Sequence, residues 1–507
     1  MKENVRGRVR QRKVSILRRL AGVQNGGQPN GPVLSPAKPK VEVSARTRAT
    51  GYGGIVAAHR VAVGSGLAEQ IDAGLQLLKI HQPYHESDHV LNLAYNALCG
   101  GRCLDDIELR RNDEAYLDAL GAIAIPDPTT AGDFCRRFEA DDVDGLMKIV
   151  NAARLVIWAR QPAEFRSRTA RLDVDASIIP TTGGSKQGMA LSFKGVWGYS
   201  ALLVTLANTG EPLFIRLYGA NRPSHEGAPA TLDKAIALVR AGGFEDVLLR
   251  GDTDYSMTAH LDRWTGVGVR FVLGYDASKG MKTRAGELDE NLYRELVRHA
   301  EESFAGKRRA RQPRVKEEIV RERNYKNLKL RREDVAEFPY KPGKAKLTYR
   351  MIALRKNISV ERGDNALFDE IRYFFYITND RKMDALDVVR EANGRCDQEN
   401  IIGELKSGVR ALHAPVNTLV ANWAYMVMTS LAWTLKAWMA LSLPVSARWR
   451  GKHERERRTW LRMGFRTFVN AVICIPAQVL TTGRRTIVRL LAWKPQLHVM
   501  LRMLDAW

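Results

Sequence analysis

The spacing of apolar positions changes near residue 170, which divides the chain into regions of different predicted structure. Between residues 65 and 160 the apolar residues recur at helical spacing, as from Leu67 to Leu78 and from Val90 to Leu98. The segment 126–130, Pro-Asp-Pro-Thr-Thr, predicts a turn followed by the start of a helix. Residues 51–165 are therefore expected to form a helical domain.

From residue 170 the pattern indicates strands that alternate with helices. Residues 172–179, 199–207 and 212–218 read as strands, and the turn Asn-Thr-Gly-Glu at 208–211 joins the last two into a hairpin. The pattern then predicts a helix over 229–241 and two further strands, at 247–249 and 269–274. This order is typical of an α/β fold with a mixed central sheet, which we place in residues 166–280.

The last third of the chain departs from this layout and then returns to it. Residues 281–370 read as a basic insertion, and 371–412 as a strand at 371–378 with a long helix over 384–410. Residues 413–507 are expected to form a helical C-terminal domain. The uncharged stretch 411–435 is interpreted as a buried core helix and not as a membrane span, because His413, Pro415, Asn417 and Asn422 interrupt it.

The charge of the chain points to a polyanionic partner. Lys and Arg number 79 against 56 acidic residues, a net charge of +23, for which nucleic acid or an anionic membrane surface are the alternatives. Residues 1–50 hold 12 Lys and Arg and read as a disordered basic arm. The basic run 307–332 is interpreted as a nucleic-acid contact or as a solvated face. The predicted helix over 131–138, with Arg136 and Arg137, is either a DNA-reading helix or a plain amphipathic one.

Two aspartates stand where an unpaired charge is costly. Asp175 and Asp252 lie in or directly after apolar strands, so a compensating partner such as a divalent metal ion is expected. Strand side chains alternate with period two, so Asp173 points to the same face as Asp175. The alternation therefore leaves both Asp173 and Asp175 as candidate ligands.

A third acid lies on the helix predicted near residue 400. Arg395, Glu399 and Lys406 fall within roughly 40° of one another around a helix with about 100° per residue, so one face presents an acid between two bases. A surface ladder of ion pairs would produce the same spacing. The spacing alone leaves both interpretations open.

These residues together resemble a known family. The pattern Arg395-x3-Glu399-x6-Lys406 resembles the signature of the DDE insertion-sequence transposases, group 1, which have an RNase H-like catalytic core. Residues 172–177, Leu-Asp-Val-Asp-Ala-Ser, resemble the first-strand motif of that family, Asp-x-(Thr/Ser), and 250–252, Arg-Gly-Asp, resemble its second carboxylate block. The resemblance runs from about residue 85 to the C-terminus.

The resemblance implies specific roles for individual residues. It selects Asp175 over Asp173, because Ser177 follows two residues later, and Asp252 over Asp254. It implies that Asp175, Asp252 and Glu399 are the catalytic, metal-binding acids. The signature normally begins with a tyrosine three residues before the arginine, and this chain has Ala392 there. The 147-residue gap from Asp252 to Glu399 fits relatives that have a β-rich insertion in the core. The expected fold is this core, flanked by N- and C-terminal helical domains.

The resemblance also implies the chemistry and the partners. Three carboxylates would hold two Mg²⁺ ions, or Mn²⁺, because hard oxygen ligands favour these ions over zinc. Arg395 and Lys406 would contact DNA phosphates. The N-terminal helical domain would bind DNA, and the partners would be the double-stranded element ends and the target, bound by a homodimer. The protein is expected in the bacterial cytoplasm, associated with the nucleoid and not with a membrane.

Three other functions are alternatives to this interpretation. Residues 85–89, His-Glu-Ser-Asp-His, match the zinc-peptidase pattern H-E-x-x-H, a short pattern that arises easily by chance. A non-catalytic DNA-binding protein derived from a transposase is the main alternative, although all three acids are present. A basic RNA-binding protein lacks support, because the aromatic recognition motifs of such folds do not occur.

Overall fold

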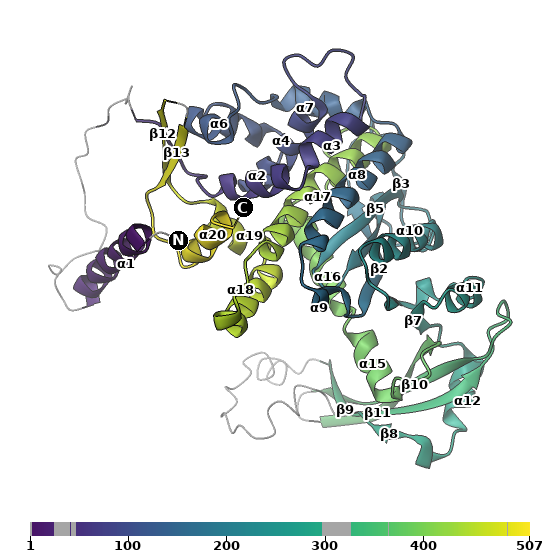
Figure 1. The fold of residues 1–507 in the computed structure, drawn as a ribbon. Coiled ribbons are helices and arrows are strands. Elements are labelled where there is room, and N and C mark those ends of the chain that lie inside the picture. The colour runs from purple at the N-terminus through teal and green to yellow at the C-terminus, as the bar shows by residue number, and fades with distance from the viewer. Residues whose placement is uncertain are drawn as a thin grey trace.

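The computed structural model describes residues 3–24, 41, 47–296, 326–362, 365–483 and 485–506. Figure 1 shows a helical region joined to a sheet that continues into a separate β-rich extension at the lower right of the view. Over these described residues the structure can be compared with the elements predicted from the sequence.

The central part of the sheet has five strands: β2 (Ala170–Pro180), β4 (Trp197–Leu206), β5 (Glu211–Gly219), β6 (Val247–Gly251) and β7 (Arg270–Tyr275). Their order is β5-β4-β2-β6-β7. Strand β4 runs antiparallel to β2 and β5, whereas β6 runs parallel to β2 and β7. The predicted mixed central sheet is confirmed, and each predicted strand of residues 166–280 is present.

Helices and a buried interior explain why these strands carry nearly continuous apolar runs. Helix α10 (Ala228–Ala241) connects β5 to β6 and contacts β2, β4 and β5, and α11 (Leu261–Gly266) connects β6 to β7. All five residues of β6 are buried, as is β4 from Gly198 onward. Strands covered on both faces read as apolar runs and not as an alternating pattern.

The predicted insertion extends the central sheet. Long antiparallel strands β9 (Lys326–Tyr340), β10 (Tyr349–Arg362) and β11 (Asn365–Thr378) follow one another, and β11 pairs with β7. Two smaller elements, α12 (Lys279–Gly286) and β8 (Arg294–Glu295), lie between β7 and β9 in the chain, and β8 pairs with β9. A short strand, β3 (Ala190–Leu191), pairs with β4. Most of the basic run 307–332 lies outside the described residues, and its end, 326–332, belongs to β9.

The predicted N-terminal helical region is present. Its helices are α2 (Ile55–Gly64), α3 (Leu67–Gly74), α4 (Glu86–Leu98), α5 (Glu108–Arg111), α6 (Glu114–Leu120), α7 (Pro128–Arg136), α8 (Ala140–Ala159) and α9 (Ala163–Arg166). Helix α7 begins where the Pro-Asp-Pro turn predicted it. The side chain of Asp127 caps it by accepting a 2.9 Å hydrogen bond from the backbone N–H of Thr130.

A single long helix joins the helical region to the sheet. Helix α17 (Leu419–Leu441) contacts α4, α8 and β5, and every residue from Ala421 to Leu441 is buried. The prediction of a buried core helix at this point is confirmed. None of the helices in the described ranges combines the length and the apolar character needed to cross a bilayer.

The structure differs from the sequence prediction in three places. Residues 3–24 of the predicted disordered arm form helix α1 (Glu3–Gln24), because Gly and Pro become frequent only after residue 24; residues 25–40 and 42–46 lie outside the described residues. The predicted helix 384–410 is divided into α15 (Ala385–Asn393), α16 (Cys396–Gly403) and a π-helical turn (Glu404–Gly408), with Gly394 at the first break.

The third difference lies in the C-terminal region, which is not wholly helical. Helices α18 (Arg450–Arg462), α19 (Phe465–Phe468) and α20 (Leu497–Leu504) are accompanied by a hairpin of β12 (Ala477–Thr482) and β13 (Arg485–Leu490). Strand β1 (Ala49–Thr50) adds to β12. The β-branched residues of this segment favour strands, which the helical prediction overlooked.

Candidate active site

Asp175 occupies the middle of β2, with its side chain 17% exposed. One carboxylate oxygen, Oδ1, accepts a hydrogen bond of 2.8 Å from the backbone N–H of Ala176. Burial raises the pKa of Asp175 to about 6, against the lowering effect of Arg395, and the charges of Asp252 and Glu399 raise it further. The carboxylate is thus partly buried and close to other acids, so a cation would stabilise its charged form.

Asp252 follows the end of β6 and begins a short 3₁₀ turn (Thr253–Tyr255). Its Oδ1 accepts a 3.0 Å hydrogen bond from the backbone N–H of Asp254. Burial raises the pKa of Asp252, while that hydrogen bond and Arg395 lower it. Strand β6 runs parallel to β2 with Arg250 paired to Asp173, so Asp252 and Asp175 each follow that pair by two residues and lie level with one another.

Glu399 comes from α16, and its side chain is 63% exposed. The neighbouring Gln398 is fully buried and accepts a hydrogen bond from the hydroxyl of Thr205 on β4. This bond fixes α16 against the sheet, so that the helix presents Glu399 toward Asp175. The charge of Glu399 raises the pKa of both aspartates, which places the three predicted acids in one electrostatic environment.

Arg395 lies among these acids. Its Nη1 is 3.3 Å from Asp175 Oδ2, and its Nη2 is 3.7 Å from Glu399 Oε1. The guanidinium side chain is only 19% exposed. Arg395 is therefore a counter-ion of two catalytic candidates, Asp175 and Glu399. The contact with Glu399 is an ion pair of the kind that the helical spacing left open as an alternative.

Lys406 reaches the same strand as Asp175 from the π-helical turn. Its Nζ donates a 2.9 Å hydrogen bond to the backbone carbonyl of Ile178. Burial lowers the pKa of Lys406, the charge of Lys194 lowers it too, and Asp175 raises it. Lys194 and Lys406 together make the surroundings of the acids basic on this side.

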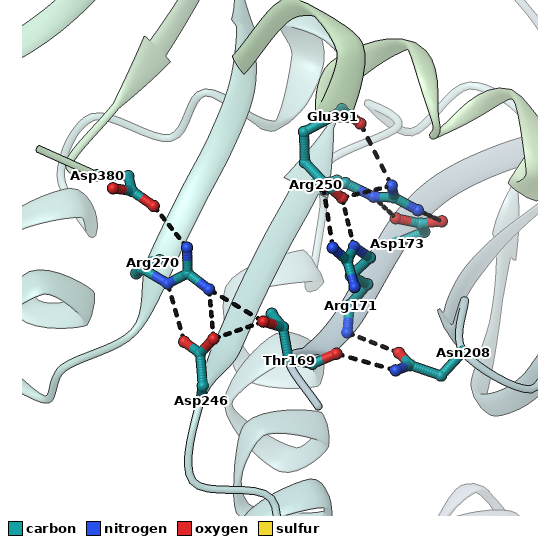
Figure 2. Close-up of polar contacts among 9 residues, drawn as sticks. All are labelled: Thr169, Arg171, Asp173, Asn208, Asp246, Arg250, Arg270, Asp380 and Glu391. Atoms are coloured by element: carbon teal, nitrogen blue, oxygen red, sulfur yellow. Dashed lines mark hydrogen bonds and ion pairs between the residues drawn. The ribbon is translucent and has the colours of Figure 1, made fainter. Parts of the chain in front are cut away.

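Asp173 has a different partner, which separates it from Asp175. Arg250 donates to both oxygens of Asp173, at 2.6 and 2.8 Å, and both side chains are almost fully buried. Figure 2 shows Arg250 between Asp173 and Glu391, with Arg171 binding the same glutamate. The implied choice of Asp175 over Asp173 is thus accompanied by a structural role for Asp173.

A second ion pair network in Figure 2 ties the central strands to the last strand of the sheet. Arg270 of β7 donates to Asp246, which precedes β6, and also to Asp380, which follows β11. Thr169 donates to Asp246 at 2.6 Å. These contacts hold β6, β7 and β11 in place, and β6 and β7 in turn position the turn that carries Asp252.

Sequence reasoning did not find the glycine and the tyrosine that shape this turn. A Cβ atom at Gly274 would lie 2.8 Å from Thr253 N and 2.9 Å from the carbonyl carbon of Asp252, so only glycine lets β7 pass the turn. Tyr255 is buried behind the acids and donates to the carbonyl of Ser224 at 3.2 Å. The position of Gly274 in an otherwise apolar strand was the available signal.

The pattern H-E-x-x-H does not form a peptidase site. His89 is buried, and its ring stacks on Phe134 with 4.3 Å between ring centroids. Glu86 accepts hydrogen bonds from the backbone N–H groups of Leu77 and Leu78. The second histidine is therefore part of the core, and the glutamate is bound to backbone.

The donor set of the three acids fits Mg²⁺ or Mn²⁺. All three are carboxylates, and the two aspartates have pKa values raised by burial, a cost that a divalent cation would offset. Among the described residues, the group of potential metal ligands whose atoms all lie within 4.8 Å of one another is His81, His85 and Glu86, and not the three acids. The three acids are therefore spaced more widely than the ligands of one ion.

Comparison with known proteins identifies the family. A structure of a piggyBac transposase synaptic complex with hairpin DNA aligns with 82% of this chain and 81% of its own, at 11% identity and a TM-score of 0.36. No curated protein sequence matches the chain. The family model described as "Transposase DDE domain group 1" matches residues 36–506, which is nearly the whole chain. The protein therefore belongs to the family of transposases with a group 1 DDE domain.

Proposed function

We propose that this transposase cleaves the ends of an insertion sequence and joins them to target DNA, with Asp175, Asp252 and Glu399 as its catalytic acids. One observation carries the proposal. Side chains from β2, from the end of β6 and from α16 share one electrostatic environment, in which the charges of Asp252 and Glu399 raise the pKa of Asp175. Acids that are far apart along the chain but shift one another's pKa values are typical of a functional site.

Asp175, Asp252 and Glu399 would hold two Mg²⁺ or Mn²⁺ ions, which activate the attacking oxygen and stabilise the leaving oxygen of a phosphoryl transfer. The chain itself supplies the positions of these ligands. Thr205 fixes α16 through Gln398, and Gly274 gives the Asp252 turn its room. Burial of Asp175 keeps bulk water from screening the interaction with a cation.

Arg395 and Lys406 would bind the phosphates of the element end. Both lie beside Asp175, and neither basic side chain can ligate a metal ion. On this proposal Arg395, which contacts Asp175 and Glu399 in the free protein, would contact a DNA phosphate in the complex. Such a change of partner would leave both carboxylates free to ligate metal ions.

The partners follow from the charge of the whole chain and from the chemistry. A net charge of +23 favours double-stranded DNA as the polyanion that the protein binds, both at the element ends and at the target. Bringing two ends together requires two copies of the site, so we propose a homodimer on DNA. We also propose the bacterial cytoplasm, in association with the nucleoid, as its location.

The alternative is a DNA-binding protein that has lost catalysis. Cleavage of DNA that carries the inverted repeats flanking the coding region tests both, in buffer with Mg²⁺ and in buffer with EDTA. The proposal expects Mg²⁺-dependent nicking by the wild type and none by Asp175→Asn, with DNA binding nearly unchanged. The matched control is Asp254→Asn, an exposed acid beside Asp252, which should still cleave. DNA binding without cleavage by the wild type would support the alternative.

A further inference from the structure

Two histidines and one glutamate gather where the loop after α3 meets the start of α4. One ring nitrogen of His81, one of His85 and a carboxylate oxygen of Glu86 all lie within 4.8 Å of one another. His81 lies in the loop, whereas His85 precedes α4 and Glu86 is its first residue. These residues belong to the helical region and share no element with the catalytic acids of β2, β6 and α16.

The glutamate of this cluster is the unusual member. Its side chain is fully buried, and Oε1 accepts 3.0 Å hydrogen bonds from the backbone N–H groups of Leu77 and Leu78. The other oxygen, Oε2, is buried and has no hydrogen-bond partner among the described residues. It lies 3.2 Å from Nδ1 of His81. A buried carboxylate oxygen without a donor calls for a cation on that side.

The two imidazole rings are arranged to approach the same cation. The rings of His81 and His85 are stacked, with 5.4 Å between centroids and 12° between planes. The His81 side chain is 47% exposed and His85 is also exposed, so that an ion from solvent can reach the ring nitrogens.

We propose that His81, His85 and Glu86 bind one zinc-class divalent cation. Two imidazole nitrogens and one carboxylate oxygen are a ligand set that zinc accepts, and a water molecule would complete a tetrahedral site. The nitrogen ligands select against Mg²⁺, which prefers oxygen and octahedral geometry. The bound ion would tie the loop of residues 75–85 to the start of α4 and so stabilise the helical region.

A structural ion pair between protonated His81 and Glu86 is the competing explanation of the same contact. It would stabilise the metal-free protein and would respond to no metal ion. The two explanations therefore differ in metal content and in the effect of zinc on thermal unfolding, neither of which depends on catalysis.

The test measures zinc in the purified full-length chain after equilibrium dialysis against limiting Zn²⁺. Excess Mg²⁺ is present throughout to occupy the carboxylates of the active site. His81→Ala removes an exposed ligand, and His85→Asn removes an imidazole while keeping a residue that is favoured before a helix. The matched control is His498→Ala, since His498 is 47% exposed and lies 3.6 Å from Glu456.

The proposal expects one zinc per wild-type chain and per His498→Ala chain, with a zinc-dependent rise in melting temperature. His81→Ala and His85→Asn should each bind zinc more than about tenfold more weakly and lose that rise. Cobalt in place of zinc should show no thiolate charge-transfer band, which excludes the cysteines as ligands. Absence of zinc from the wild type, or equal zinc binding by His81→Ala, would overturn the proposal.

Discussion

Asp173 and Asp175 are two residues apart on one strand face, yet their surroundings assign them different roles. Asp173 is fully buried and bound by both nitrogens of a guanidinium fork from Arg250. Asp175 is partly exposed, lies near two other acids and has only the looser contact with Arg395. Strand periodicity predicted that both point the same way, but it could not predict which one would find an arginine on the next strand.

Asp175→Asn should stabilise the metal-free protein at neutral pH. The pKa of Asp175 rises from 3.8 to about 6 on folding, so the stability linked to its protonated form is complete below about pH 4 and is lost as the pH rises through 6. The amide has no such loss, and the difference should reach about 3 kcal/mol in favour of the variant above pH 7.

Denaturant unfolding in EDTA from pH 4 to pH 8 measures this difference. Added Mg²⁺ should then stabilise the wild type and leave Asp175→Asn unchanged. A wild type that is as stable as the variant in EDTA at pH 8 would show that Asp175 is not strained by burial.

The same substitution two residues earlier should have the opposite effect. Asp173→Asn removes one of the two charge partners of buried Arg250, the other being Glu391, and loss of one member of a buried pair costs about 3–5 kcal/mol. We expect a lower midpoint of urea unfolding at pH 7.5, accompanied by reduced soluble expression. Asp175→Asn is the matched control, and equal stability of the two variants would contradict the roles assigned here.

At the scale of elements, the sequence predicted the strands better than it predicted the breaks between helices. Apolar runs located β2, β4, β5, β6 and β7, because the interior of a sheet imposes that pattern over several residues. The division of residues 384–410 into α15, α16 and a π-helical turn depends on how Gln398 and Lys406 meet β4 and β2, and such tertiary contacts leave no periodic signal.

Gly274→Ala should slow cleavage by about tenfold or more with little effect on DNA binding. The added Cβ would meet backbone atoms of Thr253 and Asp252 at 2.8 and 2.9 Å, so the turn that carries Asp252 must move. Small displacements of a catalytic group have large effects on rate. Single-turnover nicking measures the effect. Gly280→Ala, where the added Cβ has no neighbour within 4 Å, should cleave normally, and a normal rate for Gly274→Ala would show that the turn tolerates displacement.

Lys406→Met should weaken binding to the element end and flatten its dependence on salt. One lost phosphate contact lowers the log–log slope by about 0.9. Binding titrations across a salt series measure the slope, and Lys406→Arg, which keeps the charge, should retain it. If Lys406 serves only to hydrogen-bond Ile178, the methionine variant will melt at a lower temperature with an unchanged slope.

At the scale of the whole molecule, the insertion and the two ends of the chain are parts of one architecture. The insertion continues the central sheet through β11, and α17 packs both on α4 and α8 of the N-terminal region and on β5. The sequence indicated a β-rich insertion and a core helix, but pairing of β1 with β12 joins residues more than four hundred positions apart. Such distant contacts cannot be read from local patterns.

The central claim is that Asp175, Asp252 and Glu399 bind the metal ions that support DNA cleavage. Replacement of Asp175 by cysteine tests it most directly, because a thiolate is a poor ligand for Mg²⁺ and a better one for Mn²⁺. Single-turnover cleavage of element-end DNA is measured for the wild type and Asp175→Cys in each metal. We expect that the wild type cleaves in both, whereas Asp175→Cys is inactive in Mg²⁺ and regains part of its activity in Mn²⁺. Cleavage by Asp175→Cys in Mg²⁺ at the wild-type rate would contradict it.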